Sequence, residues 1–381
     1  MDRRSFLLSL GALALSQGLM GCRRNTSLLQ VGLVAQSLPA QLVSRFSSSI
    51  NAEADLKLLL ASNAEQLFTE LQQNSNPKSE PERQPNFIER ILNVVFGPPP
   101  TAISPVTSLG DYWLQTAIDQ NLINPWSVDH LKGWDMLDPK WQNMVRRDRQ
   151  GQPSPVGEIW GAPYRWGATG IAYRKDKFRG LGWTPTDWSD LWRPELKHKI
   201  SLLDQPREVI GLTLKKLNHS YNTPNPEAIP TLLAELKALD QQAQSYSSSH
   251  YLQALLLEDT WAAVGWSADI LKTQSEESEI GFVIPQSGTA LWSDIWVWPK
   301  VGSSDAKLLE KWATFWWQSD IAKALTQFTD AASTVRLENL PPGPTAQFLS
   351  SQPWFSKSEL LEPISDTTRQ QYESLWQKMR A

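Results

Sequence analysis

Cysteine and histidine are scarce in this chain. Its 381 residues include one cysteine and four histidines. A single cysteine excludes a disulfide framework and a zinc site built from several cysteines. The histidines are His130, His198, His219 and His250, and none has a histidine partner at the short spacing of metal-binding motifs. We therefore expect no metal centre.

An excess of positive charge is also missing. Lys and Arg number 36 against 40 Asp and Glu, which gives a net charge of -4. A protein that binds nucleic acid needs basic residues to neutralise phosphates. We therefore expect no nucleic-acid partner.

The common motifs of nucleotide-binding proteins and hydrolases are absent as well. The chain has no G-x-x-x-x-G-K-[ST], no G-x-G-x-x-G and no H-E-x-x-H. Its nearest approach to a nucleophile elbow is Gly265-Trp266-Ser267-Ala268-Asp269, which lacks the second glycine that the strained serine turn needs. A hydrolase is therefore disfavoured, and we expect a binding protein without a cofactor.

The one apolar run of note lies at the N-terminus. Phe6 to Leu15 follows Arg3 and Arg4, and ten residues are too few for a membrane span of ~20. A charged start followed by a short apolar run is typical of a signal peptide. Leu19-Met20-Gly21-Cys22 resembles a lipoprotein lipobox, and the paired arginines resemble a twin-arginine export signal. We expect residues 1–21 to be removed and Cys22 to carry a lipid, the alternative being an ordinary secretory peptide.

Tryptophan, in contrast, is abundant. The chain has 19 Trp against 7 Tyr and 11 Phe. Trp offers a large flat apolar surface and one N–H donor, so it suits both half-buried packing and stacking on a ligand. We expect most of these side chains to be packing residues and a few to line a ligand site.

Apolar patterning predicts an α/β fold. Strands are expected over 28–35 and 56–60, with helices over 38–49 and 63–73. This β-α-β-α order is typical of a doubly wound lobe. The segment 161–173 is rich in glycine and aromatic residues and is expected to end in a short strand at 171–173. Further strands are expected over 200–203, 261–266, 281–284 and 291–298, and helices over 112–120, 206–217, 229–242, 306–317, 321–329 and 367–379.

Four blocks resemble one family. They are Pro163–Tyr173, Trp188–Leu196 continuing into Leu202–Val209, Gly265–Asp269 and Ile284–Asp294. In content and order they are similar to the spermidine/putrescine-binding proteins of bacterial ABC importers, within the wider solute-binding proteins. The resemblance covers about residues 160–300. Residues 28–160 agree only in the order of their elements.

The resemblance implies a two-lobed α/β fold, like that of periplasmic binding proteins, with a hinge and a ligand cleft between the lobes. After the signal peptide (1–21) and a polar spacer (22–27), the first lobe would cover 28–171 and the second 172–291. The chain would return to the first lobe over 292–340, and 341–381 would pack toward the second. Such a protein is expected to act outside the cytoplasm as a membrane-anchored monomer.

The resemblance also implies a set of ligand contacts. A polyamine needs carboxylates for its ammonium groups and aromatic faces for its methylene groups. Asp294 would grip a primary ammonium, and Trp266 and Trp292 would be aromatic walls. The remaining contacts would be Glu208, Tyr112, Gln205 and Glu362.

Parts of the family pattern are missing. Where the family has Trp-Thr-x-Tyr after the first strand, this chain has Val34-Ala35-Gln36-Ser37. Where the family has a second carboxylate, this chain has Gln205, and its nearest acid, Asp204, is displaced by one residue. The position of a tyrosine of the family falls near Ala332 in this chain. We therefore expect a polyamine or another small organic cation, delivered to an ABC permease. The alternative is a repurposed lipoprotein that has no ligand and acts as a structural or signalling partner.

The anchor can be tested directly. Because Cys22 is the only cysteine, Cys22→Ser should leave the exported protein unacylated and move it from the detergent phase to the aqueous phase in a partitioning assay. Unchanged partitioning of the variant would contradict the lipid anchor.

Overall fold

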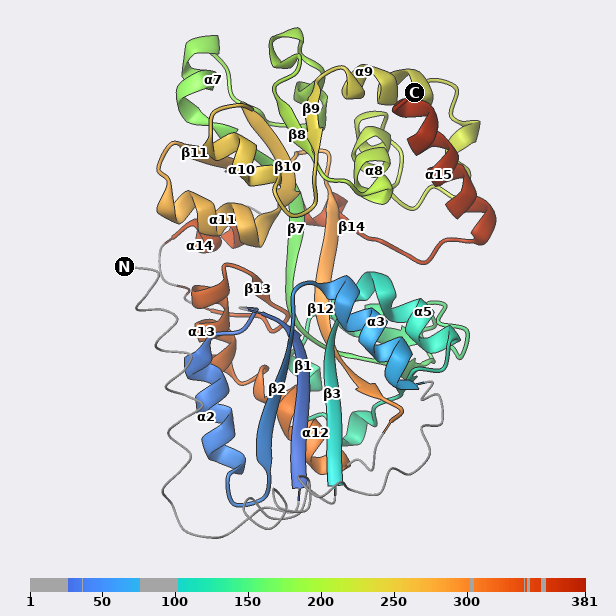
Figure 1. Cartoon of the computed structure of the whole chain (residues 1–381), viewed down its shortest axis with the longest axis vertical. Coiled ribbons are helices and arrows are strands. Elements are labelled where there is room, and N and C mark those ends of the chain that lie inside the picture. The colour runs from blue at the N-terminus through green and yellow to red at the C-terminus, as the bar shows by residue number, and fades with distance from the viewer. Residues whose placement is uncertain are drawn as a thin grey trace, which may run out of the picture.

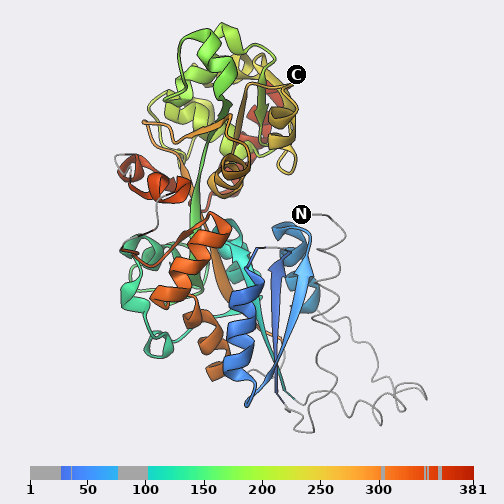
Figure 2. The same cartoon turned by 90° about the vertical axis from the view of Figure 1, so that its left-hand side faces the viewer.

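The computed structural model describes residues 27–35, 37–75, 102–301, 305–338, 340, 343–350 and 354–381. These residues form two lobes, which lie one above the other in Figures 1 and 2. Each lobe has a hydrophobic core of its own. The first core is drawn mainly from residues 29–168 and 291–355, and the second mainly from residues 171–264 with Tyr372, Leu375 and Met379. The expected two-lobed α/β fold is therefore confirmed.

The elements of the first lobe come from both ends of the chain. They are β1 (Ser27–Val34), α2 (Ala40–Ile50), β2 (Asp55–Ala61), α3 (Ala64–Ser75), β3 (Ala102–Gly110), α5 (Leu114–Asp119), β4 (Ile123–Asn124), α6 (Pro139–Val145), β5 (Arg146–Arg147), β6 (Glu158–Ile159), α12 (Ala306–Phe315), α13 (Ser319–Thr329) and β13 (Ala332–Ser333). The short helix α14 (Pro344–Ser350) follows them along the chain and packs against α11 (Ser267–Glu276). Helix α2 begins directly after Pro39, which occupies its N-cap position.

The second lobe is built from the middle of the chain and the C-terminal helix. Its elements are α7 (Lys175–Leu181), β8 (Ile200–Leu202), α8 (Pro206–Lys216), α9 (Leu232–Asp240), β9 (Ala243–Tyr246), α10 (Tyr251–Leu256), β10 (Ala262–Trp266), α11 (Ser267–Glu276), β11 (Ile280–Val283) and α15 (Asp366–Met379). Helix α15 packs against α8 and α9, as Figure 1 shows at the upper right.

Two long strands, β7 (Ala162–Arg174) and β12 (Ala290–Pro299), connect the lobes (Figure 1). They pair with each other antiparallel, and the sheet runs in the order β2-β1-β3-β12-β7-β10-β8-β9. The short strand β14 (Glu359–Leu360) joins the edge of β12. Within each lobe the outer strands are parallel: β1 with β2 and β3, and β8 with β9 and β10.

The length of β7 corrects the sequence prediction. A strand was expected only over 171–173, but β7 extends over 13 residues. Its glycines do not form turns. A Cβ atom on Gly167 would lie 2.2 Å from the ring of Trp292, and one on Gly170 would lie 2.5 Å from the ring of Phe282. The glycines therefore let aromatic side chains from neighbouring strands lie directly on the β7 backbone.

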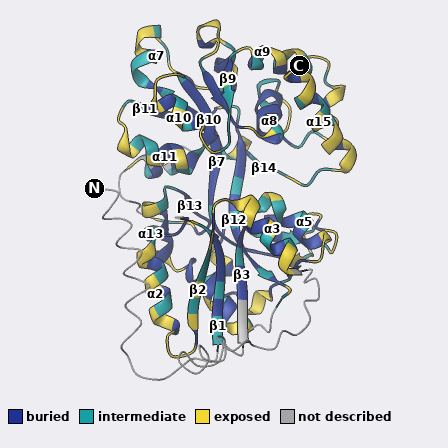
Figure 3. Ribbon diagram, viewed as in Figure 1, coloured by how far each residue is buried: buried dark blue, intermediate teal, exposed yellow. Residues whose placement is uncertain are grey.

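Most tryptophans are packing residues, as expected. Trp296 is fully buried in the first core, stacked on Tyr164 at a ring-centroid distance of 4.4 Å and in edge contact with Trp312 at 5.1 Å. Figure 3 shows the same pattern, with buried central strands and exposed outer helix faces. Among the described residues, no helix combines the length and apolar character needed to span a bilayer.

Removal of a core tryptophan should strongly destabilise the first lobe. We expect Trp296→Ala to lower the free energy of unfolding by about 3–5 kcal/mol, because it removes buried apolar area and leaves a cavity. Phe328, which is 60% exposed, provides the matched aromatic control. Denaturant titration should show a much smaller change for Phe328→Ala, and equal losses in the two variants would contradict the packing described here.

Candidate ligand site between the lobes

The carboxyl ends of the parallel strands of the two lobes converge on β7 and β12. In the first lobe, β3 ends at Gly110, which pairs with Asp294 of β12. In the second lobe, β10 ends at Trp266, which pairs with Thr169 of β7. In open α/β sheets, ligands bind beyond the carboxyl ends of the strands. We call the residues gathered here the interlobe site: Asp111, Arg165, Thr169, Glu208, Trp266, Asp269, Trp292 and Asp294.

An ion pair links the two crossing strands in this site. Arg165 of β7 lies directly opposite Asp294 of β12. Its Nε and Nη2 atoms both donate to Asp294 Oδ2 at 2.6 Å, and its Nη1 donates to the carbonyl oxygen of Ser37 at 3.0 Å. Burial acts to lower the pKa of Arg165, but the carboxylates of Asp294 and Asp269 raise it above its ordinary value. Asp294 is therefore already neutralised by a residue of the chain itself.

A bulge in β7 adjoins this pair. Asp294 pairs with Arg165 but the next residue, Ile295, pairs with Pro163, so Tyr164 has no partner across the ladder. A bulge lets two successive side chains take directions that a regular strand would not allow. Tyr164 stacks on Trp296 in the core and bonds Ser108 through its hydroxyl at 3.0 Å, while Arg165 reaches the interlobe site.

Asp111 is a functional candidate that the sequence analysis did not select. It follows β3 and opens a short 3-10 helix, Asp111–Trp113. Its carboxylate accepts a hydrogen bond of 3.1 Å from the backbone N–H of Ser293. Burial raises the pKa of Asp111 to about 7 and the negative charge of Asp294 acts in the same direction, while the hydrogen bond from Ser293 and the positive charge of Arg147 act to lower it. Among the described residues Asp111 forms no salt bridge.

Glu208 is the second buried acid of the site. It lies in the first turn of α8 and is 7% exposed. Burial raises its pKa to about 7 and the charge of Asp111 contributes, while the positive charge of the neighbouring Arg207 acts to lower it. Thr169 faces this carboxyl and lowers its pKa, yet neither Thr169 Oγ1 nor Glu208 Oε2 completes a hydrogen bond of ordinary geometry with the described residues. The Oε2 atom of Glu208 is therefore a buried hydrogen-bond acceptor that no described residue satisfies.

The two predicted aromatic walls lie on neighbouring parts of the site. Trp292 covers Gly167, and its indole N–H has no partner among the described residues. Trp266 is held in edge contact with Tyr251, at a ring-centroid distance of 5.9 Å. The hydroxyl of Tyr251 donates to Asp269 at 2.7 Å and accepts from the backbone N–H of Trp266 at 3.2 Å. Asp269 is thereby fixed at the start of α11, where its charge acts on Arg165.

The other predicted contacts lie nearer the surface. Tyr112 is 54% exposed and lies in edge contact with Trp113. Gln205 is exposed at the N-cap of α8. Glu362 is exposed, and its backbone carbonyl accepts from Arg207 at 3.3 Å. These residues stay predictions, and Cys22 lies outside the described residues.

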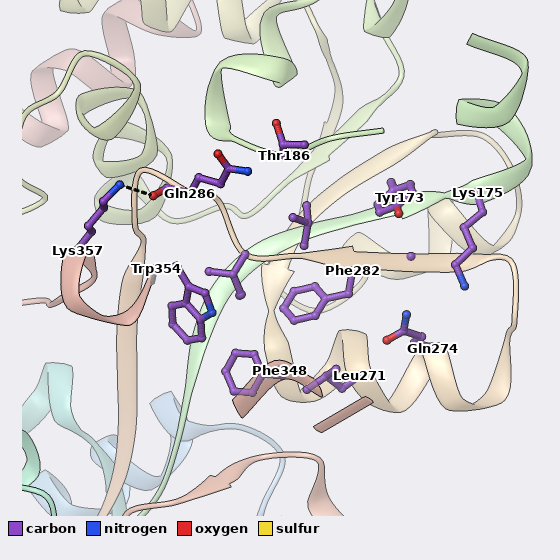
Figure 4. A pocket seen from close by; sticks show the side chains of 13 residues that line it. Tyr173, Lys175, Thr186, Leu271, Gln274, Phe282, Gln286, Phe348, Trp354 and Lys357 are labelled. Atoms are coloured by element: carbon purple, nitrogen blue, oxygen red, sulfur yellow. Dashed lines mark hydrogen bonds between the residues drawn. The ribbon is translucent and has the colours of Figure 1, made fainter. Parts of the chain in front are cut away.

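A separate pocket of about 680 Å³ lies away from these residues. Figure 4 shows that it is floored by Leu271, Phe282, Phe348 and Trp354, and that Lys357 donates to the backbone oxygen of Gln286 at its rim. Its lining includes two lysines and no carboxylate. This pocket therefore lacks the groups that would hold a cation. No group of three or more metal-ligating side chains occurs among the described residues.

The fold and the site together define a solute-binding protein of the two-lobed class. Residues 106–354 match the family model of the bacterial extracellular solute-binding proteins. The chain belongs to this family, whose members bind solutes outside the cytoplasm and are not enzymes.

Individual relatives agree with this assignment. The spermidine/putrescine-binding periplasmic protein 1 of Haemophilus influenzae is 29% identical over 189 residues, 50% of each chain. The spermidine/putrescine-binding periplasmic protein of Salmonella typhimurium is 26% identical over 216 residues, 57% of this chain and 59% of its own length. The chain thus spans between half and three fifths of these curated relatives.

Among solved structures, the spermidine/putrescine substrate-binding protein PotD of Streptococcus pneumoniae superposes with a TM-score of 0.75. The superposition covers 93% of this chain and 98% of the PotD chain, and the two sequences are 18% identical. The Tp0655 lipoprotein of Treponema pallidum superposes with a TM-score of 0.68 at 16% identity, covering 93% of this chain and 99% of its own. At these identities the likeness describes the fold.

The raised pKa values of Asp111 and Glu208 predict a pH-dependent stability. The ordinary values are 3.8 and 4.5, so between about pH 4 and pH 7 the folded protein holds protons that the unfolded chain has released. The free energy of unfolding should therefore fall as the pH rises through this window. Asp111→Asn combined with Glu208→Gln should remove much of this fall and make the protein more stable than the wild type above pH 7.

Denaturant titrations at a series of pH values would measure this effect. Glu195→Gln, a change at an exposed acid, is the control and should leave the wild-type slope in place. The same slope in the double variant and in the control would contradict the raised pKa values of Asp111 and Glu208.

Proposed function

We propose that this chain captures a small organic cation of the polyamine class at the interlobe site and delivers it to an ABC permease. The observation that carries the proposal is the presence of two acids, Asp111 and Glu208, that form no salt bridge among the described residues and have pKa values raised to about 7. A buried carboxylate without a partner is unfavourable, and a bound cation would supply that partner.

Polyamine chemistry fits the groups that surround these acids. The ammonium groups would pair with the carboxylates of Asp111 and Glu208 through charge-assisted hydrogen bonds. The methylene groups would lie against Trp266 and Trp292, whose rings also attract cations. The names of the relatives, which include spermidine, putrescine and cadaverine binders, support the same class of ligand.

Delivery would use the two-lobed architecture. Within the part of the chain that the structure describes, β7, β12 and the segment before α15 pass between the lobes, so the lobes can close over a ligand that contacts both. A permease that recognises the closed form would then take up loaded protein selectively. We further propose that the protein works as a monomer held at the membrane by a lipid on Cys22.

The alternative function is that of a repurposed lipoprotein without a ligand. It is favoured by Val34-Ala35-Gln36-Ser37 in place of the family's aromatic set and by the internal partner of Asp294. A thermal-shift screen of the protein against polyamines, other cations and sugars separates the two functions, because a ligand that binds only the folded state must raise its unfolding temperature.

Cation binding should depend on Glu208 and on pH. We expect Glu208→Gln to weaken putrescine binding about tenfold to a hundredfold, since it replaces a charged partner by a neutral one. In the wild type, affinity should increase from about pH 6 to pH 8, as the acids ionise while amines stay charged. Isothermal titration calorimetry would measure both. Protons released on binding are taken up by the buffer, so the measured binding enthalpy should depend on the buffer's enthalpy of ionisation.

Two controls accompany this measurement. Glu195→Gln should bind putrescine like the wild type, and 4-aminobutyrate, which carries one ammonium and one carboxylate, should bind far more weakly than putrescine. Tighter binding of 4-aminobutyrate or of a sugar than of any polyamine would contradict the proposed function.

A further inference from the structure

Arg165 occupies the place where an ammonium group of a ligand would be expected. Asp294 projects from the same face of β12 as Trp292, two residues away, so the pair has the composition of a cation subsite. Asp294 Oδ2 accepts from both Nε and Nη2 of Arg165 at 2.6 Å. Only 16% of the Arg165 side chain and 22% of the Asp294 side chain are exposed.

The position of Arg165 is fixed on several sides. The third guanidinium nitrogen, Nη1, donates to the carbonyl oxygen of Ser37, and the guanidinium lies 5.8 Å from the ring centre of Tyr164. Asp269 adds a second negative charge nearby. A ligand that displaced Arg165 would leave a buried guanidinium without its partners, which is strongly unfavourable. Arg165 is thus a stable occupant of this subsite.

The acids left for a ligand are closer to each other than Asp294 is to Glu208. Arg165 and Thr169 are separated by four residues of β7, roughly 13 Å at ~3.3 Å per residue, and Glu208 faces Thr169. Asp111, in contrast, accepts from the backbone N–H of Ser293, which pairs with Trp166 of β7. Trp166 is only three residues from Thr169, roughly 10 Å at ~3.3 Å per residue. The span available to a ligand is therefore the shorter one, from Asp111 to Glu208.

We propose that Arg165 is a resident cation that fills the Asp294 subsite and thereby restricts the interlobe site to short diamines. This inference rests on the proposed function and names the ligand class within it. A diamine can pair its two ammonium groups with Asp111 and Glu208. A longer triamine has a further ammonium, which would meet the guanidinium of Arg165 at the place where Asp294 would otherwise offer its carboxylate.

The test compares putrescine and spermidine in the full chain by titration calorimetry. The wild type should bind putrescine at least tenfold more tightly than spermidine. Arg165→Met removes the resident cation and keeps a side chain of similar length, so it should shift the putrescine-to-spermidine affinity ratio at least tenfold in favour of spermidine. Arg165→Lys retains a cation and should keep the wild-type preference.

A second substitution connects the effect to Asp294. In Arg165→Met combined with Asp294→Asn, the shift in favour of spermidine should be lost, because the freed carboxylate is absent. If Arg165→Met does not fold, Arg165→Gln, which can still donate to Ser37, takes its place and should show the same shift.

The outcomes separate this inference from the proposed function. A wild type that binds no amine at all would overturn both. Amine binding with an unchanged putrescine-to-spermidine ratio in Arg165→Met, or tighter spermidine binding by the wild type that Asp294→Asn abolishes, would overturn the role of Arg165 and leave the proposed function in place.

Discussion

The antiparallel pairing of β7 with β12 is the constraint on which the rest of the molecule depends. Both strands pass through the two cores, so each contributes to the packing of both lobes. Both strands cross from one lobe to the other between these cores (Figure 2). Polar side chains placed there, such as Arg165 and Asp294, are therefore the ones that a ligand between the lobes would meet.

Charge balance decides what such a ligand can be. One acid of the interlobe site is paired within the chain, and two others, Asp111 and Glu208, keep raised pKa values because burial disfavours their charged forms. The site therefore contains one carboxylate that is occupied by an internal guanidinium and two acids that form no salt bridge among the described residues. This arrangement can discriminate among cationic ligands, because an ammonium group is stabilised only where a carboxylate is not already paired.

Tryptophan has two roles that differ by burial rather than by sequence context. Trp292, Asp294 and Trp296 alternate along β12 and share one face, yet Trp296 is stacked in the core while Trp292 is half-buried over Gly167. Trp296 belongs to the first hydrophobic core, and Trp292 does not. Neighbouring aromatic residues of one strand face can thus serve packing in one place and border a ligand site in another.

The sequence by itself determined the α/β class, the order of the first elements and the family, because hydrophobic periodicity and contiguous motifs are local properties of the chain. It also pointed to Glu208, Trp266, Trp292 and Asp294, which the fold brings together. Only the tertiary structure decided that Asp111 faces the site while the adjacent Tyr112 faces solvent, since successive side chains of a 3-10 helix differ in direction by about a third of a turn and composition leaves no trace of this. It alone decided that Asp294 has a partner from β7, because that contact joins residues 129 positions apart through a bulge at Tyr164.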